Sequence, residues 1–189
     1  MRYYFLFLFA LVQLTAKAQV ISKFDSTLKI GKAGFRVLCF NKSPEKNMLN
    51  LRPIGFKNEA REVSFEIKGR VLGAEIDDLN MDGFPDMVVF AMEPNEKKYI
   101  IAISSRENES YVPIYMPDLT NDPTLSKGYR GKDEYKLVEG VLFRKFPIYT
   151  EDTTNKVPTN KSRQIMYRVN TGEKGILNFK SFKSFDIAN

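Results

Sequence analysis

Residues 78–86 carry oxygen-bearing side chains at a spacing that can surround a divalent cation. The segment reads Asp-Leu-Asn-Met-Asp-Gly-Phe-Pro-Asp, with carboxylate or amide oxygens at its first, third, fifth and ninth positions and glycine at its sixth. Calcium prefers such hard oxygen ligands. In the calcium hypothesis the ion is structural, and its ligands are the side chains of Asp78, Asn80, Asp82 and Asp86 with the backbone carbonyl of Phe84.

Metal binding is one of two interpretations of this acidic loop. An EF-hand needs a bidentate glutamate at the twelfth position, where this chain has Val89. The apolar run after the loop also predicts a strand in place of a second helix. Three like charges within nine residues favour a cation between them, yet Asp, Asn and Gly are also the residues that close turns through bonds to the backbone. Both interpretations are open from sequence.

The acids that could serve a hydrolase are Asp133, Glu134 and Glu139. A glycosidase needs two carboxyl groups that face each other across a cleft, whereas these three lie in a strand–turn–strand pattern that predicts a solvated surface. The chain has no histidine. The usual neutral-pH base, the partner of a serine or cysteine nucleophile and the commonest zinc ligand are therefore missing. We expect a protein that is not an enzyme.

The first 18 residues have the pattern of an export signal peptide. Arg2 precedes an apolar run from Tyr3 to Leu14, and Ala16-Lys17-Ala18 is a small-x-small cleavage site. The run is shorter than the roughly 20 residues that a membrane span needs. We expect a soluble exported protein, periplasmic or secreted, that begins at Gln19 and has no membrane span.

The distribution of charge and the single cysteine indicate which partners and which disulfide bonds are to be expected. The formal charge is +6, and removal of Arg2 and Lys17 with the signal peptide leaves +4. The basic residues are interleaved with acids along the chain, whereas nucleic-acid binding gathers them on one stripe, so we expect no nucleic-acid partner. Cys39, the only cysteine, lies in an apolar run. This context predicts a buried thiol and excludes an internal disulfide.

Short strands are predicted along most of the mature chain. Val63, Phe65 and Ile67 alternate with polar residues, which is the pattern of a half-buried strand. Residues 87–92 are almost wholly apolar and predict a central strand that is covered on both faces. Phe179, Phe182 and Phe185 predict a packed edge segment. Further strands are expected at residues 99–103, 111–115, 135–138, 141–149 and 164–169, with a tight turn at Glu139-Gly140 and one helical turn near Asp122.

The fold class that we expect is all-β, an antiparallel β-sandwich of short strands with little helix after the signal peptide. Residues 19–61 are less regular and are predicted to form N-terminal strands or an extension. Residues 62–189 are predicted to form the sandwich domain. A chain of this length supports one domain with a substantial core.

Several segments between Gly73 and Val169 follow one another in an order that is typical of a known family. They are residues 78–86 with the strand that follows, 128–135 (Gly-Tyr-Arg-Gly-Lys-Asp-Glu-Tyr), 138–149 (Val-Glu-Gly-Val-Leu-Phe-Arg-Lys-Phe-Pro-Ile-Tyr), Asp152, Asn155, Pro158-Thr159 and 164–167. In this order they resemble the periplasmic inhibitors of invertebrate-type lysozyme. The resemblance covers about half of the chain, and the central block is its most specific part.

The resemblance implies a non-catalytic β-sandwich, often a homodimer, that inhibits a muramidase by inserting a loop into the catalytic cleft. In the family that loop carries a Ser-Gly…Tyr element whose hydroxyl groups reach the catalytic carboxylates. The corresponding loop here is residues 92–99, in which Tyr99 fits the aromatic position and the Ser-Gly pair is absent. Glu96 stands near the position of the serine and would repel a carboxylate.

The partner-binding residues that we expect are therefore Asn95, Glu96, Lys97, Lys98 and Tyr99, with a lysozyme-type glycosidase as partner. Lys97 or Lys98 can pair with the catalytic carboxylates of such an enzyme, although two exposed lysines also serve to blunt a β-edge. The alternative function is a calcium-stabilised exported module that binds a glycan or protein of the cell envelope.

Overall fold

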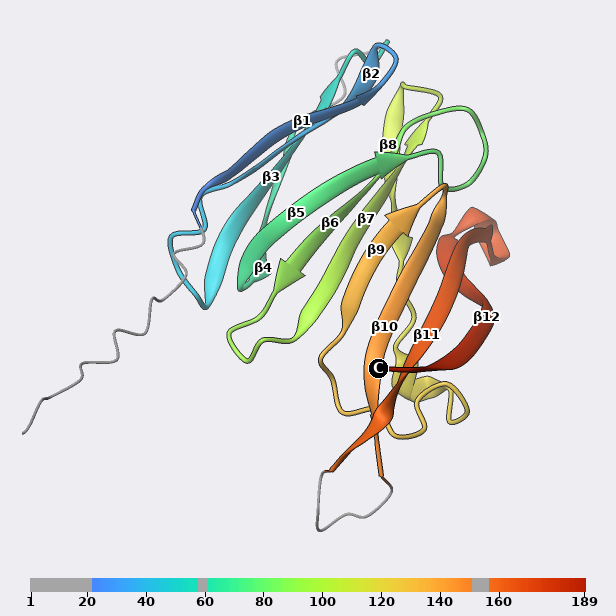
Figure 1. Cartoon of the computed structure of the whole chain (residues 1–189). Helices are drawn as coiled ribbons and strands as arrows, with labels where there is room; N and C mark the ends of the chain where they lie inside the picture. Colours follow the sequence, from blue (N-terminus) through green and yellow to red (C-terminus); the bar gives the residue numbers. More distant parts are fainter. Residues whose placement is uncertain (1–21, 58–60, 151–156) are drawn as a thin grey trace, which may run out of the picture.

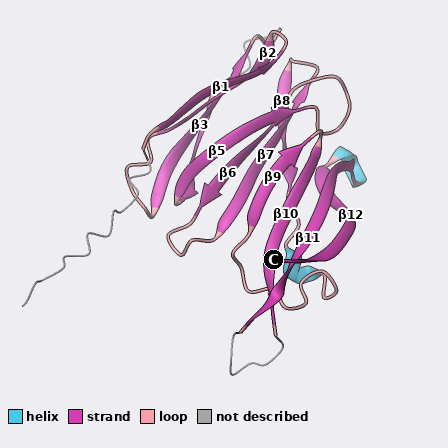
Figure 2. Ribbon diagram, viewed as in Figure 1, coloured by secondary structure: helices cyan, strands magenta, loops and turns pink. Residues whose placement is uncertain are grey.

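The computed structural model describes residues 22–57, 61–150 and 157–189, and their regular secondary structure is almost entirely β-strand (Figures 1 and 2). The predicted signal peptide lies outside them, as do Asp152 and Asn155. Within the described ranges, no helix has the length and apolar character needed to cross a membrane.

The strands are connected mostly by short turns, with one 3-10 turn at Leu119–Asn121 and another at Glu173–Gly175. The strands are β1 (Phe24–Ile30), β2 (Ala33–Cys39), β3 (Lys46–Ile54), β4 (Val63–Lys68), β5 (Arg70–Asp77), β6 (Asp86–Met92), β7 (Lys98–Arg106), β8 (Ser110–Tyr115), β9 (Glu134–Val138), β10 (Val141–Tyr149), β11 (Pro158–Thr171) and β12 (Leu177–Ala188).

These strands form a small sheet and a large sheet. The small sheet is antiparallel and has the order β1-β2-β3-β4, whereas the large sheet has the order β5-β6-β7-β8-β12-β11-β10-β9. The large sheet curls until it is nearly closed, and one of its pairs, β12 with β8, is parallel. The all-β prediction is confirmed. The prediction of a wholly antiparallel sandwich of short strands is too simple, because the large sheet is mixed and β11 and β12 run for 14 and 12 residues.

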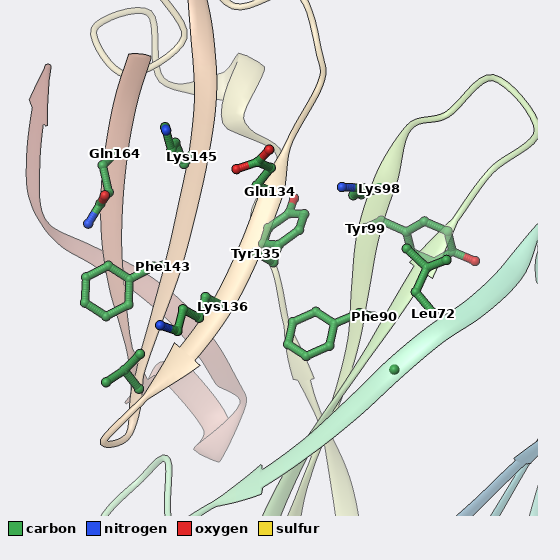
Figure 3. A pocket seen from close by; sticks show the side chains of 12 residues that line it. Leu72, Phe90, Lys98, Tyr99, Glu134, Tyr135, Lys136, Phe143, Lys145 and Gln164 are labelled. Carbon is green, nitrogen blue, oxygen red and sulfur yellow. The ribbon is translucent and has the colours of Figure 1, made fainter. Parts of the chain in front are cut away.

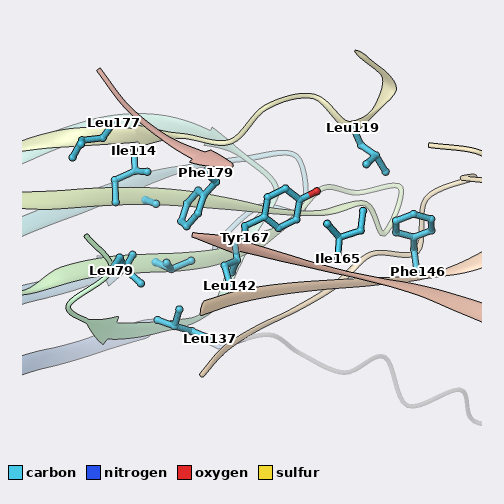
Figure 4. Packing of buried hydrophobic residues seen from close by; sticks show 12 residues of the cluster. Leu79, Ile114, Leu119, Leu137, Leu142, Phe146, Ile165, Tyr167, Leu177 and Phe179 are labelled. Atoms are coloured by element: carbon cyan, nitrogen blue, oxygen red, sulfur yellow. The ribbon is translucent and has the colours of Figure 1, made fainter. Parts of the chain in front are cut away.

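Strand β6 separates two hydrophobic cores. Met87 and Val89 point toward the small sheet, where they pack with Phe35, Leu49 and other side chains of one core. Val88 points into the curl of the large sheet, where the second core gathers around Leu142, Phe146, Ile165 and Phe179 (Figure 4). The predicted central strand is thus confirmed, and its apolar character on both faces follows from a core on each side.

Most of the predicted local elements are found at the expected residues. The half-buried strand is β4, and the hairpins β7–β8 and β9–β10 are antiparallel. Glu139 and Gly140 both have positive φ, 49° and 72°, which is the backbone of a two-residue hairpin turn. The turn predicted over residues 122–126 is present, because the Asp122 side chain accepts from the N–H groups of Thr124 and Leu125 and its carbonyl accepts from that of Ser126. The 3-10 turn at Leu119–Asn121 precedes it. Cys39 is fully buried, as predicted.

Two further predictions concern the C-terminal strand and the N-terminal region. Strand β12 pairs with β8 only at Leu177 and Asn178, so in the described chain the segment with Phe179, Phe182 and Phe185 pairs with β11 alone and lies at an edge. Phe179 is buried, but Phe182 is 46% exposed and Phe185 38%. In the region predicted as strands or an extension, β1, β2 and β3 pair into one sheet with β4.

The chain passes from the small sheet to the large sheet at Gly69, between β4 and β5. Its φ of +78° lies in the left-handed region, and a Cβ atom there would lie 1.8 Å from the carbonyl oxygen of Met92. Its N–H donates to the carbonyl of Glu45 at 2.7 Å. Only glycine satisfies both the backbone angle and the close approach of β6.

We predict that Gly69→Ala lowers the free energy of unfolding by more than about 3 kcal/mol, because the methyl group must displace backbone as well as adopt the left-handed conformation. Gly83→Ala is the matched control, since Gly83 has a φ of +84° but no atom beyond its chain neighbours lies within 4 Å of where a Cβ atom would stand. The control should lose only about 1–2 kcal/mol. Equal losses in denaturant titrations would show that the sheet junction is not tightly packed.

Candidate functional site

The β6–β7 loop presents three of the five predicted partner-binding residues together at an exposed tip. The Glu93 N–H donates to the Lys97 carbonyl at 2.9 Å and the Glu96 N–H to the Glu93 carbonyl at 3.0 Å. The Asn95 side chain accepts from the Lys97 N–H at 3.1 Å. These bonds fix residues 94–97 as a defined, solvent-exposed turn, which we call the tip.

Lys98 and Tyr99 belong to strand β7, outside the tip. Lys98 is the first residue of β7 and is partly exposed. The Tyr99 hydroxyl donates to the Lys68 carbonyl at 2.6 Å, and burial raises the pKa of this hydroxyl to about 12. Tyr99 therefore fastens β7 to the end of β4, and its hydroxyl is already in use within the protein.

A hollow with a basic rim lies between the tip and residues 130–134. Its volume is about 570 Å³, and Lys97, Lys98, Arg130 and Lys132 contribute to its lining. The acids Glu96 and Glu134 also lie there. We call this region the basic hollow, because cations outnumber acids once the buried Asp133 is set aside as part of an internal ion pair.

Asp133, which was predicted to lie on a wet surface, is instead buried in an ion pair with Arg144. The Arg144 Nε donates to the Asp133 carboxylate at 2.6 Å, and a second guanidinium N–H donates to the Tyr129 hydroxyl at 3.0 Å. Tyr129 in turn donates to the other oxygen of Asp133. Glu134 and Glu139 are exposed, as predicted.

Aromatic rings surround the buried Arg144. Its guanidinium carbon lies 5.1 Å from the ring centre of Tyr129, 5.6 Å from that of Tyr135 and 6.0 Å from that of Phe146. Burial and the Asp133 carboxylate raise the pKa of Tyr129 to about 12, and burial raises the pKa of Tyr135. The cluster is a fully bonded internal network that anchors the segment carrying Arg130 and Lys132.

The alternation of side chains along β10 predicts the burial of Arg144. Residues 142, 144 and 146 share one face of β10 because side chains alternate along a strand. Leu142 and Phe146 are both fully buried. Arg144 must therefore point into the same core, where a buried guanidinium needs a carboxylate partner.

A seam remains where the large sheet does not close, between its end strands β5 and β9. Two side chains bridge it: the Leu137 N–H donates to the Glu75 carboxylate at 3.2 Å, and the Gly140 N–H donates to the Asp77 carboxylate at 2.7 Å. Beyond these bridges the strands separate, and a cavity of about 730 Å³ opens. Figure 3 shows Leu72, Phe90 and Tyr99 on one wall and Tyr135, Lys136 and Phe143 on the other.

The acidic loop is closed by its own side chains. The two oxygens of Asp78 accept from the N–H groups of Asp82 and Gly83 at 3.0 and 2.9 Å. The Asn80 amide nitrogen donates to Asp82 and to the hydroxyl of Ser104. These are the side-chain-to-backbone bonds that the turn interpretation predicts.

Asp86 is fully buried at the end of the acidic loop and joins it to β7. Its carboxylate accepts from the N–H groups of Leu79 at 2.9 Å, Asn80 at 3.3 Å and Ser105 at 3.1 Å. Burial raises the pKa of this carboxyl to about 7, and the N–H donors act in the opposite direction. Asp86 thus accepts from three backbone donors, of which the Ser105 N–H also donates to the Pro85 carbonyl at 3.3 Å.

The five predicted calcium ligands lie in one loop, and their side-chain oxygens are engaged in hydrogen bonds within it. All four of their side chains accept backbone N–H bonds, and the Asn80 amide nitrogen donates to the Asp82 carboxylate. In the described ranges no group of three or more His, Cys, Asp and Glu side chains is placed to hold a metal ion. Calcium binding stays a prediction from the sequence.

No protein-family model matches this chain, and no curated protein matches it. The resemblance to lysozyme inhibitors therefore rests on the sequence pattern alone.

We predict that Asp86→Ala lowers the free energy of unfolding by about 2–4 kcal/mol, because the N–H groups of Leu79 and Asn80 lose their acceptor and that of Ser105 keeps only the Pro85 carbonyl. Asp82→Ala, in the same loop, is the control. Asp82 is exposed and accepts the Phe84 N–H at 2.9 Å, so its loss should cost about 1 kcal/mol or less. Chemical denaturation of both variants would measure the difference, and similar losses would contradict the assigned role of Asp86.

The melting temperature in calcium and in chelator separates the two interpretations of the acidic loop. If the loop oxygens keep only their N–H partners, the two values should agree to within about 1 °C. A site filled at 100 times its dissociation constant would add about 2.7 kcal/mol, which is a shift of several degrees for a chain of this size. Such a shift, abolished in Asp82→Ala, would establish the calcium site instead.

Proposed function

We propose that this chain is an exported, non-catalytic binding protein whose β6–β7 tip enters the cleft of a lysozyme-type glycosidase. The observation that carries the proposal is the exposed, internally bonded tip beside the basic hollow. A glycosidase cleft holds a pair of carboxyl groups, and a cationic loop is complementary to such a cleft.

The shape of the tip and the charge of the adjacent basic hollow both support binding. The backbone bonds of the tip hold residues 93–97 in one conformation, which lowers the entropy lost when a loop is captured. Lys97 lies at the tip, and Lys98, Arg130 and Lys132 lie around the adjacent hollow. Charge-assisted bonds from ammonium or guanidinium groups to carboxylates are among the stronger hydrogen bonds in proteins.

Two observations favour binding over catalysis. The whole chain lacks histidine, so a base that works near neutral pH would have to be another group. Of the three acids considered for hydrolysis, Asp133 is engaged with Arg144 in the core, and Glu134 and Glu139 are exposed. The proposed export rests on the pattern of residues 1–18.

The test is a muramidase assay with lysozymes of the invertebrate, chicken and goose types, titrated with the chain that starts at Gln19. We expect inhibition of one type, and we expect Lys97→Glu to weaken it at least about tenfold, because a reversed charge repels the catalytic carboxylates. Lys32→Glu is the matched control, since Lys32 is exposed in the β1–β2 turn and changes the net charge by the same amount.

Tyr99→Ala is a poor probe of this proposal, because Tyr99 is half-buried and bonded to Lys68. Loss of inhibition in that variant would mix binding with folding. Absence of inhibition of all three lysozyme types by the folded protein would refute the proposed partner. Equal weakening by Lys97→Glu and Lys32→Glu would instead indicate a general charge effect and not insertion of the tip.

A further inference from the structure

We infer that the seam between β5 and β9 binds an extended acidic peptide segment of another protein, which adds to the sheet as a strand along β9. This binding site lies outside the tip and goes beyond the proposed function. The juxtaposition that carries it is an open strand edge beside an apolar cavity of about 730 Å³ with a lysine-rich rim (Figure 3).

The backbone of β9 is directed toward the seam at alternate residues. Val138 pairs with Val141 across the two-residue turn, so residues 134, 136 and 138 direct their N–H and C=O groups to β10, and residues 135 and 137 direct theirs away from it. The bond from the Leu137 N–H to Glu75 follows this geometry. In the described part of the chain β9 pairs with β10 alone, which leaves the seam-facing groups of Tyr135 open to an added strand.

The opposite edge is unsuitable for the same purpose. The N–H and C=O of Val71 on β5 are both bonded to the side chain of Asn41, each at 2.9 Å. A β-bulge between Val71 and Gly73 bends β5 at this point, as bulges do. An added strand therefore forms backbone hydrogen bonds with β9 and lies beside β5 without such bonds to β5.

The walls of the seam favour a bound peptide in which apolar residues alternate with residues of another kind. Leu72, which is 38% exposed, and Phe90 and Tyr135 offer apolar surface on the cavity side. Because side chains alternate along a strand, every second residue of the occupant faces these groups. The residues between them face the outer surface beside Lys136.

The rim selects negative charge. Lys98, Lys136 and Lys145 line the cavity, with Glu134 as the one acid among its lining residues. Among the ion pairs of the described residues, none involves these three lysines. A strand with acidic residues on its outer side would be stabilised by them. A second copy of this chain would instead bring its own lysines against these, so charge disfavours self-association at the seam.

The probe is a fluorescent, end-capped heptapeptide in which Glu and Val alternate, titrated into the chain that starts at Gln19 and followed by anisotropy. We expect saturable binding that Lys136→Glu weakens about tenfold, since one attractive cross-strand pair becomes repulsive. We also expect the bound peptide to slow hydrogen exchange at the Tyr135 amide. Lys29→Glu, an exposed lysine of β1, should bind the peptide as the unchanged protein does.

Three outcomes would overturn the inference. The first is absence of binding, and the second is equal binding of a heptapeptide with Lys in place of Glu. The third is a dimer in sedimentation that Lys136→Glu dissociates, because a second copy of the chain would then fill the seam. Lys136→Glu should leave muramidase inhibition unchanged, because Lys136 does not line the basic hollow. The two proposals can therefore fail independently.

Discussion

Burial of β6 on both faces is the constraint on which the rest of the structure depends. A strand with Met87 and Val89 on one side and Val88 on the other must be covered twice. The small sheet covers one side, and the returning strands β9 to β12 cover the other. Gly69 makes the first covering possible, because it lets the chain turn from β4 into β5 directly against β6.

The second covering forces the large sheet to curl, and the curl creates the seam. Full closure would require a ladder between β5 and β9, but a bulge bends β5 near Leu72. Glu75 and Asp77 replace part of the missing ladder with carboxylates that accept N–H groups of the β9–β10 hairpin. The remaining opening combines an apolar cavity with an unpaired edge, which natural sheets usually protect with charges such as lysine.

Two buried acids show how the chain stabilises its polar interior. Asp133 has a guanidinium partner and a tyrosine hydroxyl, whereas Asp86 has three backbone N–H donors. Each acid joins a loop to the body of the protein: Asp133 holds the segment with Arg130 and Lys132, and Asp86 holds the acidic loop against β7. The basic hollow thus has a bonded internal support beneath residues 130–134, which favours its use in recognition.

The sequence by itself determined the local elements. Alternation in Val63–Lys68, the apolar run of β6 and the Glu139-Gly140 turn each predicted the correct structure, because period-two burial and turn chemistry are local properties. The same alternation in β10 contained the burial of Arg144, and with it that of Asp133, which we had expected on the surface. Of the predicted partner-binding residues, Asn95, Glu96 and Lys97 form one tip, while Tyr99 lies in a strand.

Only the tertiary structure decided which strands are neighbours. The parallel pairing of β12 with β8, the place of β1 to β3 beside β4, and the seam between β5 and β9 join residues far apart in sequence. The burial pattern of a single strand shows which of its faces is covered, but it does not show which other strands cover that face. Pairing partners and the closure of the sheet depend on the summed packing of all the strands, so the sequence pattern contained the elements and the fold supplied their arrangement.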